Sequence, residues 1–130
     1  MHTLTRNPPI AKLLTDAYSE VSRLEYDALA AFLADRLGRP TVARVTRTSN
    51  PNTVTKWRLK KAVPKSARLE RMRETFQVFK VLVGIGLSDI NAEQWFRGKN
   101  PVLGFRMPAD VLADGDFEKV LTAVENLASE

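Results

Sequence analysis

Residues 67–83 read ARLERMRETFQVFKVLV, and this stretch decides the class of fold. Its large apolar residues recur in steps of 3, 4, 3 and 4 positions: Leu69, Met72, Phe76, Phe79 and Val83. Such spacing places the side chains on one face of an α-helix and is typical of a helix-packing seam. Further apolar residues widen that face in its second half: Val78, Val81 and Leu82. We therefore predict a long helix from Ala67 to Val83 that is covered on two sides.

Helical spacing continues on both sides of this stretch. Upstream, it predicts a helix over residues 10–24, another over residues 26–37, a short one that Pro40 opens and a further one over residues 51–59. Downstream, we predict a short helix that Asn91 and Gln94 open as a capping box, another over residues 109–113, and a last helix that Asp116 caps. No stretch shows sustained alternation of apolar and polar residues, so the predicted fold class is all-α.

The residue types argue against an enzyme. The chain has no cysteine, and its one histidine, His2, lies in residues 1–9, which we predict to be flexible. The sequence has no nucleophile with a neighbouring base, no cluster of metal ligands and no glycine-rich phosphate loop. No apolar run resembles a signal peptide or is long enough to cross a membrane. We expect a cytoplasmic, non-enzymatic protein that uses no cofactor.

Charge is distributed unevenly along the chain, whose formal net charge is +5. Residues 39–73, which we call the basic block, contain eleven Lys or Arg and a single acid, Glu70. Residues 110–130 contain six acids and one base, Lys119. A basic block attracts phosphate groups, whereas DNA repels an acidic tail. The block therefore favours a nucleic-acid partner, and the tail favours a protein or solvent.

Residues 40–58 have the outline of a helix-turn-helix, in which a tight polar turn joins two short helices. The helix that follows Asn50 and Pro51 would be the recognition helix. Amide, hydroxyl and cationic side chains can bond base edges or phosphates. The candidate DNA-binding residues are Arg44, Arg47, Asn50, Asn52, Thr53, Thr55, Lys56, Arg58, Lys60 and Lys61. The turn has no glycine, and the alternative interpretation is that the basic block is only a solvated helical face.

The segment from Trp95 to Asp116 reads WFRGKNPVLGFRMPADVLADGD. A tryptophan is followed by Asn-Pro-x-Leu, a proline with an apolar pair, Gly-Asp and a helix rich in Val and Leu. This order resembles the toxin-binding domain of the Xre/MbcA/ParS-type antitoxins. The residues that carry the resemblance are Trp95, Asn100, Pro101, Leu103, Pro108, Val111, Leu112, Gly115, Asp116 and Val120. It is firm over residues 92–127 and weaker over residues 41–64, where the family usually has an Xre-like helix-turn-helix with a glycine that this chain lacks.

The resemblance implies a helix-turn-helix DNA-binding domain over residues 10–66 and a small helical toxin-binding domain over residues 67–130. It also implies a partner, a RES-domain toxin that consumes NAD and whose nucleotide cleft the antitoxin blocks. Carboxylates could pair there with cationic groups that otherwise hold a pyrophosphate. Asn100 could instead cap its own loop, and Arg106 could meet an acid of the partner. The candidate toxin-binding residues are Asn100, Arg106, Asp110, Asp114, Asp116, Glu118, Glu125 and Glu130.

Three hypotheses follow. The first is an antitoxin that neutralises its toxin and represses its own operon by binding operator DNA as a homodimer, with higher toxin–antitoxin hetero-oligomers. In it, the seam from Leu69 to Val83 is a candidate for part of the dimer interface. The second is a stand-alone helix-turn-helix regulator without a toxin. The third is an antitoxin that binds only protein and whose helix-turn-helix has lost DNA contact.

Overall fold

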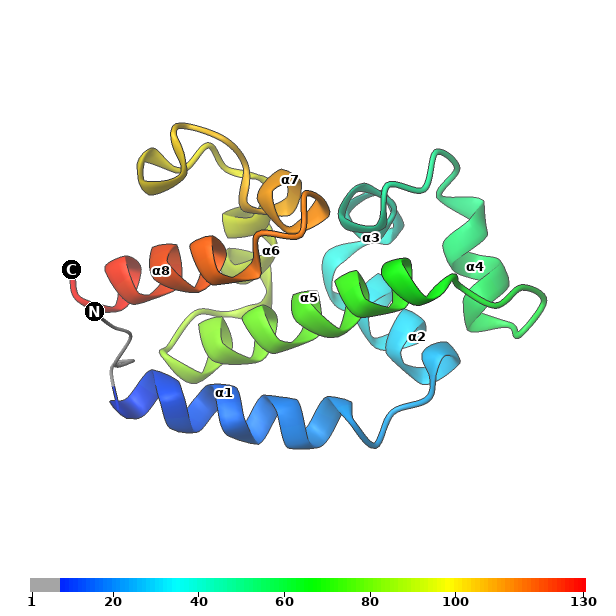
Figure 1. Ribbon diagram of the computed structural model, residues 1–130, viewed down its shortest axis with the longest axis horizontal. Coiled ribbons are helices and arrows are strands. Elements are labelled where there is room, and N and C mark those ends of the chain that lie inside the picture. The colour runs from blue at the N-terminus through cyan, green and yellow to red at the C-terminus, as the bar shows by residue number, and fades with distance from the viewer. Residues whose placement is uncertain (1–7) are drawn as a thin grey trace.

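The structure is a computed structural model that describes residues 8–130. Within that range it is built of helices, and the all-α prediction is confirmed (Figure 1). The elements are α1 (Pro8–Val21), α2 (Tyr26–Leu37), α3 (Arg39–Thr46), α4 (Asn52–Arg58), α5 (Ser66–Gly84), α6 (Asp89–Arg97), the 3-10 helix η1 (Pro101–Leu103), α7 (Pro108–Ala113) and α8 (Phe117–Ala128). His2 and most of the predicted flexible start lie outside the described residues.

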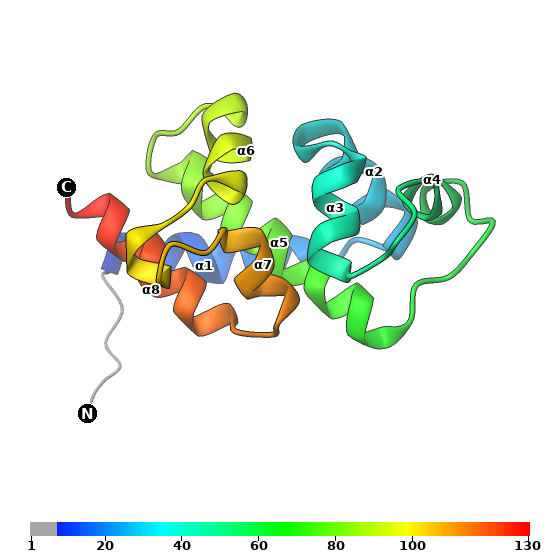
Figure 2. The same ribbon diagram turned by 90° about the horizontal axis from the view of Figure 1, so that it is seen from above.

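Helix α5 is the axis on which the other helices pack. Helix α1 runs along one side of α5 in the opposite direction, and α8 lies along another side (Figure 1). Helices α2, α3 and α4 gather at the first half of α5, and α6, η1 and α7 gather near its second half. The two groups meet where α7 packs beside α3, as Figure 2 shows from above. The fold therefore brings the segments of the two predicted domains into contact.

One hydrophobic cluster runs through the whole assembly. It includes Trp57 of α4, Phe76 of α5 and Leu112 of α7, each at most 1% exposed. The Phe32 ring packs against those of Phe76 and Phe79, with centroid separations of 4.9 and 5.7 Å. The division at residue 66 stays a prediction, and the core does not stop there.

The seam of the long helix is used inside the chain. Met72 and Phe76 are fully buried, and Phe79 is 3% exposed. A surface that already packs against α1, α2 and α8 cannot also pack against a second copy. The middle of the seam is therefore unavailable to a second copy, whereas Val83 at its end is 36% exposed, and a dimer interface stays a prediction.

Two predicted helix starts differ from the structure. Helix α1 begins at Pro8, because proline fits a first helical turn whose N–H groups have no partner anyway. Helix α6 is capped by Ser88, whose hydroxyl oxygen accepts a hydrogen bond from the Asn91 backbone N–H, so Asn91 is not the cap. Asp116 stands at the N-cap of α8 as predicted, but its side chain makes no capping hydrogen bond. Its carboxylate lies 3.6 Å from the Lys119 ammonium instead, which removes it from the backbone N–H groups.

Candidate functional site

Helices α3 and α4 are joined by a tight turn, as the sequence predicts for residues 40–58. Their inner faces are buried through Val42, Val45, Val54 and Trp57. The turn needs a left-handed residue, and Arg47 supplies it with φ +54°. Glycine is the residue that usually takes this conformation, because it does so without strain. Here Arg47 takes it, so the turn forms without a glycine. The arrangement is compatible with a helix-turn-helix, and DNA binding stays a prediction.

Most polar side chains predicted to face DNA on α4 are held by the protein itself. Nη1 of Arg39 donates to the Asn52 side-chain oxygen at 3.1 Å and to the Thr55 hydroxyl at 3.0 Å. The Asn50 side-chain oxygen accepts a hydrogen bond from the Asn52 backbone N–H at 2.9 Å and caps the helix start. Arg58 donates to Asp35 of α2 at 2.8 Å. Contact with a base edge therefore uses the groups that these bonds leave over, such as the Asn52 side-chain NH2, or displaces the internal bonds.

The lysines of this region fall into two groups. Lys60 lies 3.4 Å from Glu25 and 3.9 Å from Asp27, and the charge of Asp27, followed by the contact with Glu25, raises the pKa of its ammonium. Lys56 and Lys61 are exposed, and their ammonium groups have no partner among residues 8–130. Thr53 is half-buried beside them. Lys56 and Lys61 are thus the candidate DNA-binding cations that remain available.

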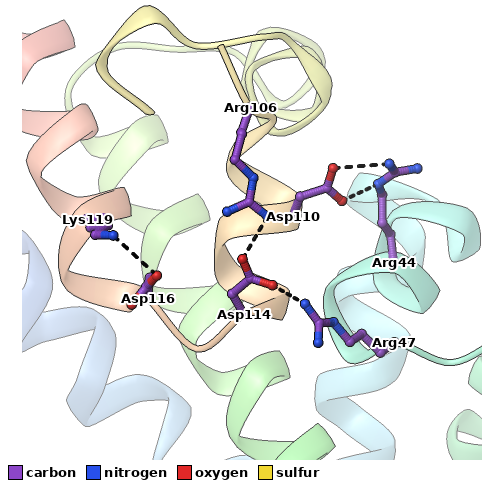
Figure 3. A network of polar contacts seen from close by, with 7 residues as sticks. All are labelled: Arg44, Arg47, Arg106, Asp110, Asp114, Asp116 and Lys119. Carbon is purple, nitrogen blue, oxygen red and sulfur yellow. Dashed lines mark hydrogen bonds and ion pairs between the residues drawn. The ribbon is translucent and has the colours of Figure 1, made fainter. Parts of the chain in front are cut away.

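Five charged side chains join α3 to the C-terminal part of the chain, and we call them the α3–α7 charge network: Arg44, Arg47, Arg106, Asp110 and Asp114 (Figure 3). Arg44 binds Asp110 through two hydrogen bonds, Nε to Oδ1 at 2.6 Å and Nη2 to Oδ2 at 3.1 Å. Asp114 contacts two arginines, Arg47 through one oxygen and Arg106 through the other, the latter at 2.7 Å. Bidentate pairs of this kind fix the orientation of both partners.

The network shifts the pKa values of Arg44 and Asp114. The hydrogen bond that Arg44 donates to Asp110 raises the pKa of Arg44, because it favours the charged guanidinium. The hydrogen bond from Arg106 lowers the pKa of Asp114, and the charges of Arg106 and Arg47 act in the same direction. Asp114 therefore stays ionised at neutral pH and keeps both arginines in place.

This network unites residues that the sequence assigned to different partners. Arg44 and Arg47 were predicted to bind DNA, whereas Asp110 and Asp114 were predicted to bind a toxin. An open pocket of about 380 Å³ lies between the two helices, and three arginines and Asp110 are among the residues that line it. In the chain without a partner, the carboxylates of Asp110 and Asp114 thus pair with Arg44 and Arg47, the residues predicted to bind DNA.

Asn100 organises the loop between α6 and α7. Its side-chain oxygen accepts from the Val102 backbone N–H at 2.9 Å, and its carbonyl accepts from the N–H groups of Leu103 and Phe105. Its own N–H donates to the Arg106 carbonyl at 3.0 Å. The loop-capping role of Asn100 is confirmed, and its contact with a partner stays a prediction.

The remaining predicted toxin-binding acids lie along α8 and at its end. Glu118 and Glu130 are exposed, Glu125 is half-buried, and Asp116 lies beside Lys119. Sequence reasoning missed the exposed Phe105 and the ion pair of Arg71 with Glu74 below the turn at Gly115. Phe105 is the only aromatic residue among residues 98–107, and this was a usable signal for it. For the Arg71–Glu74 pair, the spacing of three positions on a predicted helix was a usable local signal.

The described part of the chain offers little for metal or membrane chemistry. Among residues 8–130 no three His, Asp or Glu side chains gather as a metal site would require. No helix in that range is long and apolar enough to cross a membrane.

Comparisons with known proteins point to one class. No protein-family model matches the chain. The mycobacterial cidal antitoxin MbcA of Mycobacterium tuberculosis (strain H37Rv) and that of Mycobacterium bovis are each 29% identical over 80 residues, which span 62% of this chain and 70% of the relative. A chain in the crystal structure of the M. tuberculosis MbcT–MbcA toxin–antitoxin complex matches with a TM-score of 0.63 and 25% identity, over 79% of this chain and 93% of that one.

This chain is similar to an antitoxin. The likeness extends from sequence to fold and supports the antitoxin role that residues 95–116 predicted. It also agrees with the prediction of a non-enzymatic protein, because the relatives are named for neutralising a toxin. The type of toxin, DNA binding and oligomeric state are not addressed by these relatives and stay predictions.

Proposed function

We propose that this protein is an antitoxin that binds a partner toxin directly and neutralises it. The observation that carries the proposal is the joint likeness in sequence and fold to MbcA, whose solved structure is a complex with its toxin. A second supporting feature is the rigid C-terminal part, where α7 and α8 pack on α5. Surfaces on rigid elements bind with a smaller loss of conformational entropy than flexible ones.

We further propose that the toxin is of the RES type, consumes NAD, and is blocked at its nucleotide cleft. The α3–α7 charge network occupies Asp110 and Asp114, so neither carboxylate is available without the loss of an arginine partner. The acids of α8 and its end lie outside this network, and Glu118 and Glu130 are exposed. The proposed contact therefore moves to Glu118, Glu125 and Glu130.

Autorepression is proposed through α4 and the lysines beyond it. Lys56 and Lys61 support it, because exposed ammonium groups can bind phosphates without breaking an internal ion pair. The same two lysines favour the second candidate function, a stand-alone DNA-binding regulator. A homodimer, if this regulator needs one, uses a surface other than the buried seam of α5.

Co-purification with the product of the neighbouring gene tests the proposal. We expect a stable complex when that product carries the affinity tag. Deletion of residues 116–130 is a poor variant, because it removes Val120, Leu121 and Val124 from the core. Substitution of Glu118, Glu125 and Glu130 by Gln leaves the buried residues of α8 in place and removes only the three charges.

The matched control replaces three acids elsewhere on the surface, Asp16→Asn, Glu20→Gln and Glu70→Gln. Both triple variants change the net charge by the same amount. Weaker capture of the toxin by the α8 variant only would support the proposed cleft contact. Equal capture by both would reject that contact and leave the antitoxin role standing. Absence of any complex with the unmodified chain would reject the antitoxin role.

A further inference from the structure

The loop of residues 100–106 exposes two large apolar side chains. Phe105 is 66% exposed and Val102 is 43% exposed, whereas Leu103 between them packs against the core. The loop stands out from the body of the molecule above α8 (Figure 1). An exposed phenylalanine costs hydration free energy, so its presence calls for a use outside the isolated fold.

The loop is also held rigidly. Asn100 and Arg106 form a backbone bridge across its ends, and the Asn100 carbonyl accepts from the Phe105 N–H at 2.8 Å. Phe105 has φ +65°, in the left-handed region that bulky residues rarely adopt. A glycine there would satisfy the same backbone hydrogen bonds without strain. The fold alone therefore favours glycine at this position, not phenylalanine.

A groove of about 370 Å³ adjoins the loop and lies against α7 and α8. It is lined by Val102, Leu103, Arg106, Val111, Lys119 and Thr122, which include two basic side chains and no acidic one. The Lys119 side chain is 72% exposed and only loosely paired with Asp116. Arg106 is paired with Asp114 at 2.7 Å, so the surface is apolar with a cationic rim that Lys119 supplies.

We propose that Phe105, Val102 and the adjoining groove, together the η1 surface, dock the toxin through an apolar cleft of the toxin that is flanked by carboxylates. This inference rests on the proposed antitoxin function and adds a second contact, distinct from the acids of α8. Aromatic side chains on rigid supports are the usual anchors of protein interfaces. The cationic rim selects an acidic partner surface and disfavours another basic one.

Phe105→Gly tests the proposal without a risk to folding. The variant removes the side chain and relieves the left-handed backbone, so its melting temperature should stay equal or rise. Its Kd for the product of the neighbouring gene should increase by about thirtyfold or more. Tyr18→Ala is the matched control, because Tyr18 is 64% exposed on α1, away from the η1 surface, and its Kd should stay unchanged.

Lys119→Glu reverses one charge on the rim and should weaken the complex further when combined with Phe105→Gly. Unchanged affinity of Phe105→Gly, with the unmodified chain binding normally, would overturn the η1 surface and leave the antitoxin function intact. A second copy of this chain as the occupant would also overturn it, and would show as loss of self-association in Phe105→Gly with unchanged toxin affinity. Failure of the unmodified chain to bind would remove both proposals together.

Discussion

The basic block and the 100–106 loop differ in what they leave available to a partner. In the block, carboxylates pair with four of the cations. Arg44 and Arg47 pair with acids in α7 and directly after it, and Arg58 and Lys60 pair with acids in α2 and directly before it. In the loop, Phe105 and Val102 are presented to solvent by a backbone that is fixed at both ends. A charge counted in the sequence is therefore not a charge free to bind. An apolar residue in a loop can be the more informative feature.

The largest expected effect tests whether the two regions share one core. Trp57→Ala in α4 and Leu112→Ala in α7 each remove a side chain that is at most 1% exposed. We expect losses of about 3–5 and 2–5 kcal/mol in the free energy of unfolding, measured by urea denaturation. Each variant should still unfold in a single transition that fluorescence and circular dichroism report alike.

Thr122→Ala on the exposed face of α8 is the control and should stay within about 0.5 kcal/mol of the unmodified chain. Two separate transitions in Trp57→Ala, with α6 to α8 melting later, would contradict the shared core. They would favour two independent domains instead.

The next effect concerns DNA. The double variant Asp110→Asn with Asp114→Asn frees Arg44 and Arg47 from the α3–α7 charge network. Its affinity for a DNA duplex should rise by about threefold to tenfold at low salt, because the freed guanidinium groups can bind phosphates in place of the weak exposed ion pairs. Fluorescence anisotropy over a salt series measures it. Asp89→Asn, which faces Arg36 instead, is the control and should change affinity less.

Lys56→Ala with Lys61→Ala provides the opposite test. Loss of two phosphate contacts should flatten the dependence of log affinity on log salt by about 0.9 for each contact. No DNA binding by either variant or by the unmodified chain would reject autorepression and leave an antitoxin that binds only protein.

The smallest effect is the pH dependence of Asp114. The pKa of Asp114 is lowered in the folded state, so its carboxylate stabilises the fold above the unfolded pKa of about 4 and loses that contribution as the pH falls through the lower folded value. Asp114→Asn should melt slightly below the unmodified chain at pH 7 and together with it near pH 2. Thermal unfolding by circular dichroism measures both. An equal gap at the two pH values would show that charge is not the cause.

The sequence predicted the helical elements well because they depend on local spacing. The long helix was expected from Ala67 to Val83 and spans Ser66–Gly84, since its apolar face and the glycine at its end both act over a few residues. Helix α2 was predicted with both ends correct. The Asn91 cap was wrong because two polar residues compete for one helix start, and only the backbone angles decide between them.

The site was harder to predict because its contacts are not local. Arg44 meets Asp110 across 66 positions in the sequence, and Arg47 meets Asp114 across 67. No periodicity links such residues, and only the packing of α7 on α3 brings them together. The strained φ of Phe105 was equally hidden, because a glycine precedes it and local rules would place the left-handed residue there.

The most direct test of the central claim is growth of a bacterial culture in which the neighbouring gene is induced alone or with this chain. The account predicts arrest with the neighbouring gene alone, full growth when this chain is expressed with it, and weaker rescue by Phe105→Gly despite its normal folding. Continued arrest in the presence of the folded, well-expressed chain would contradict the claim that this protein is an antitoxin for that partner.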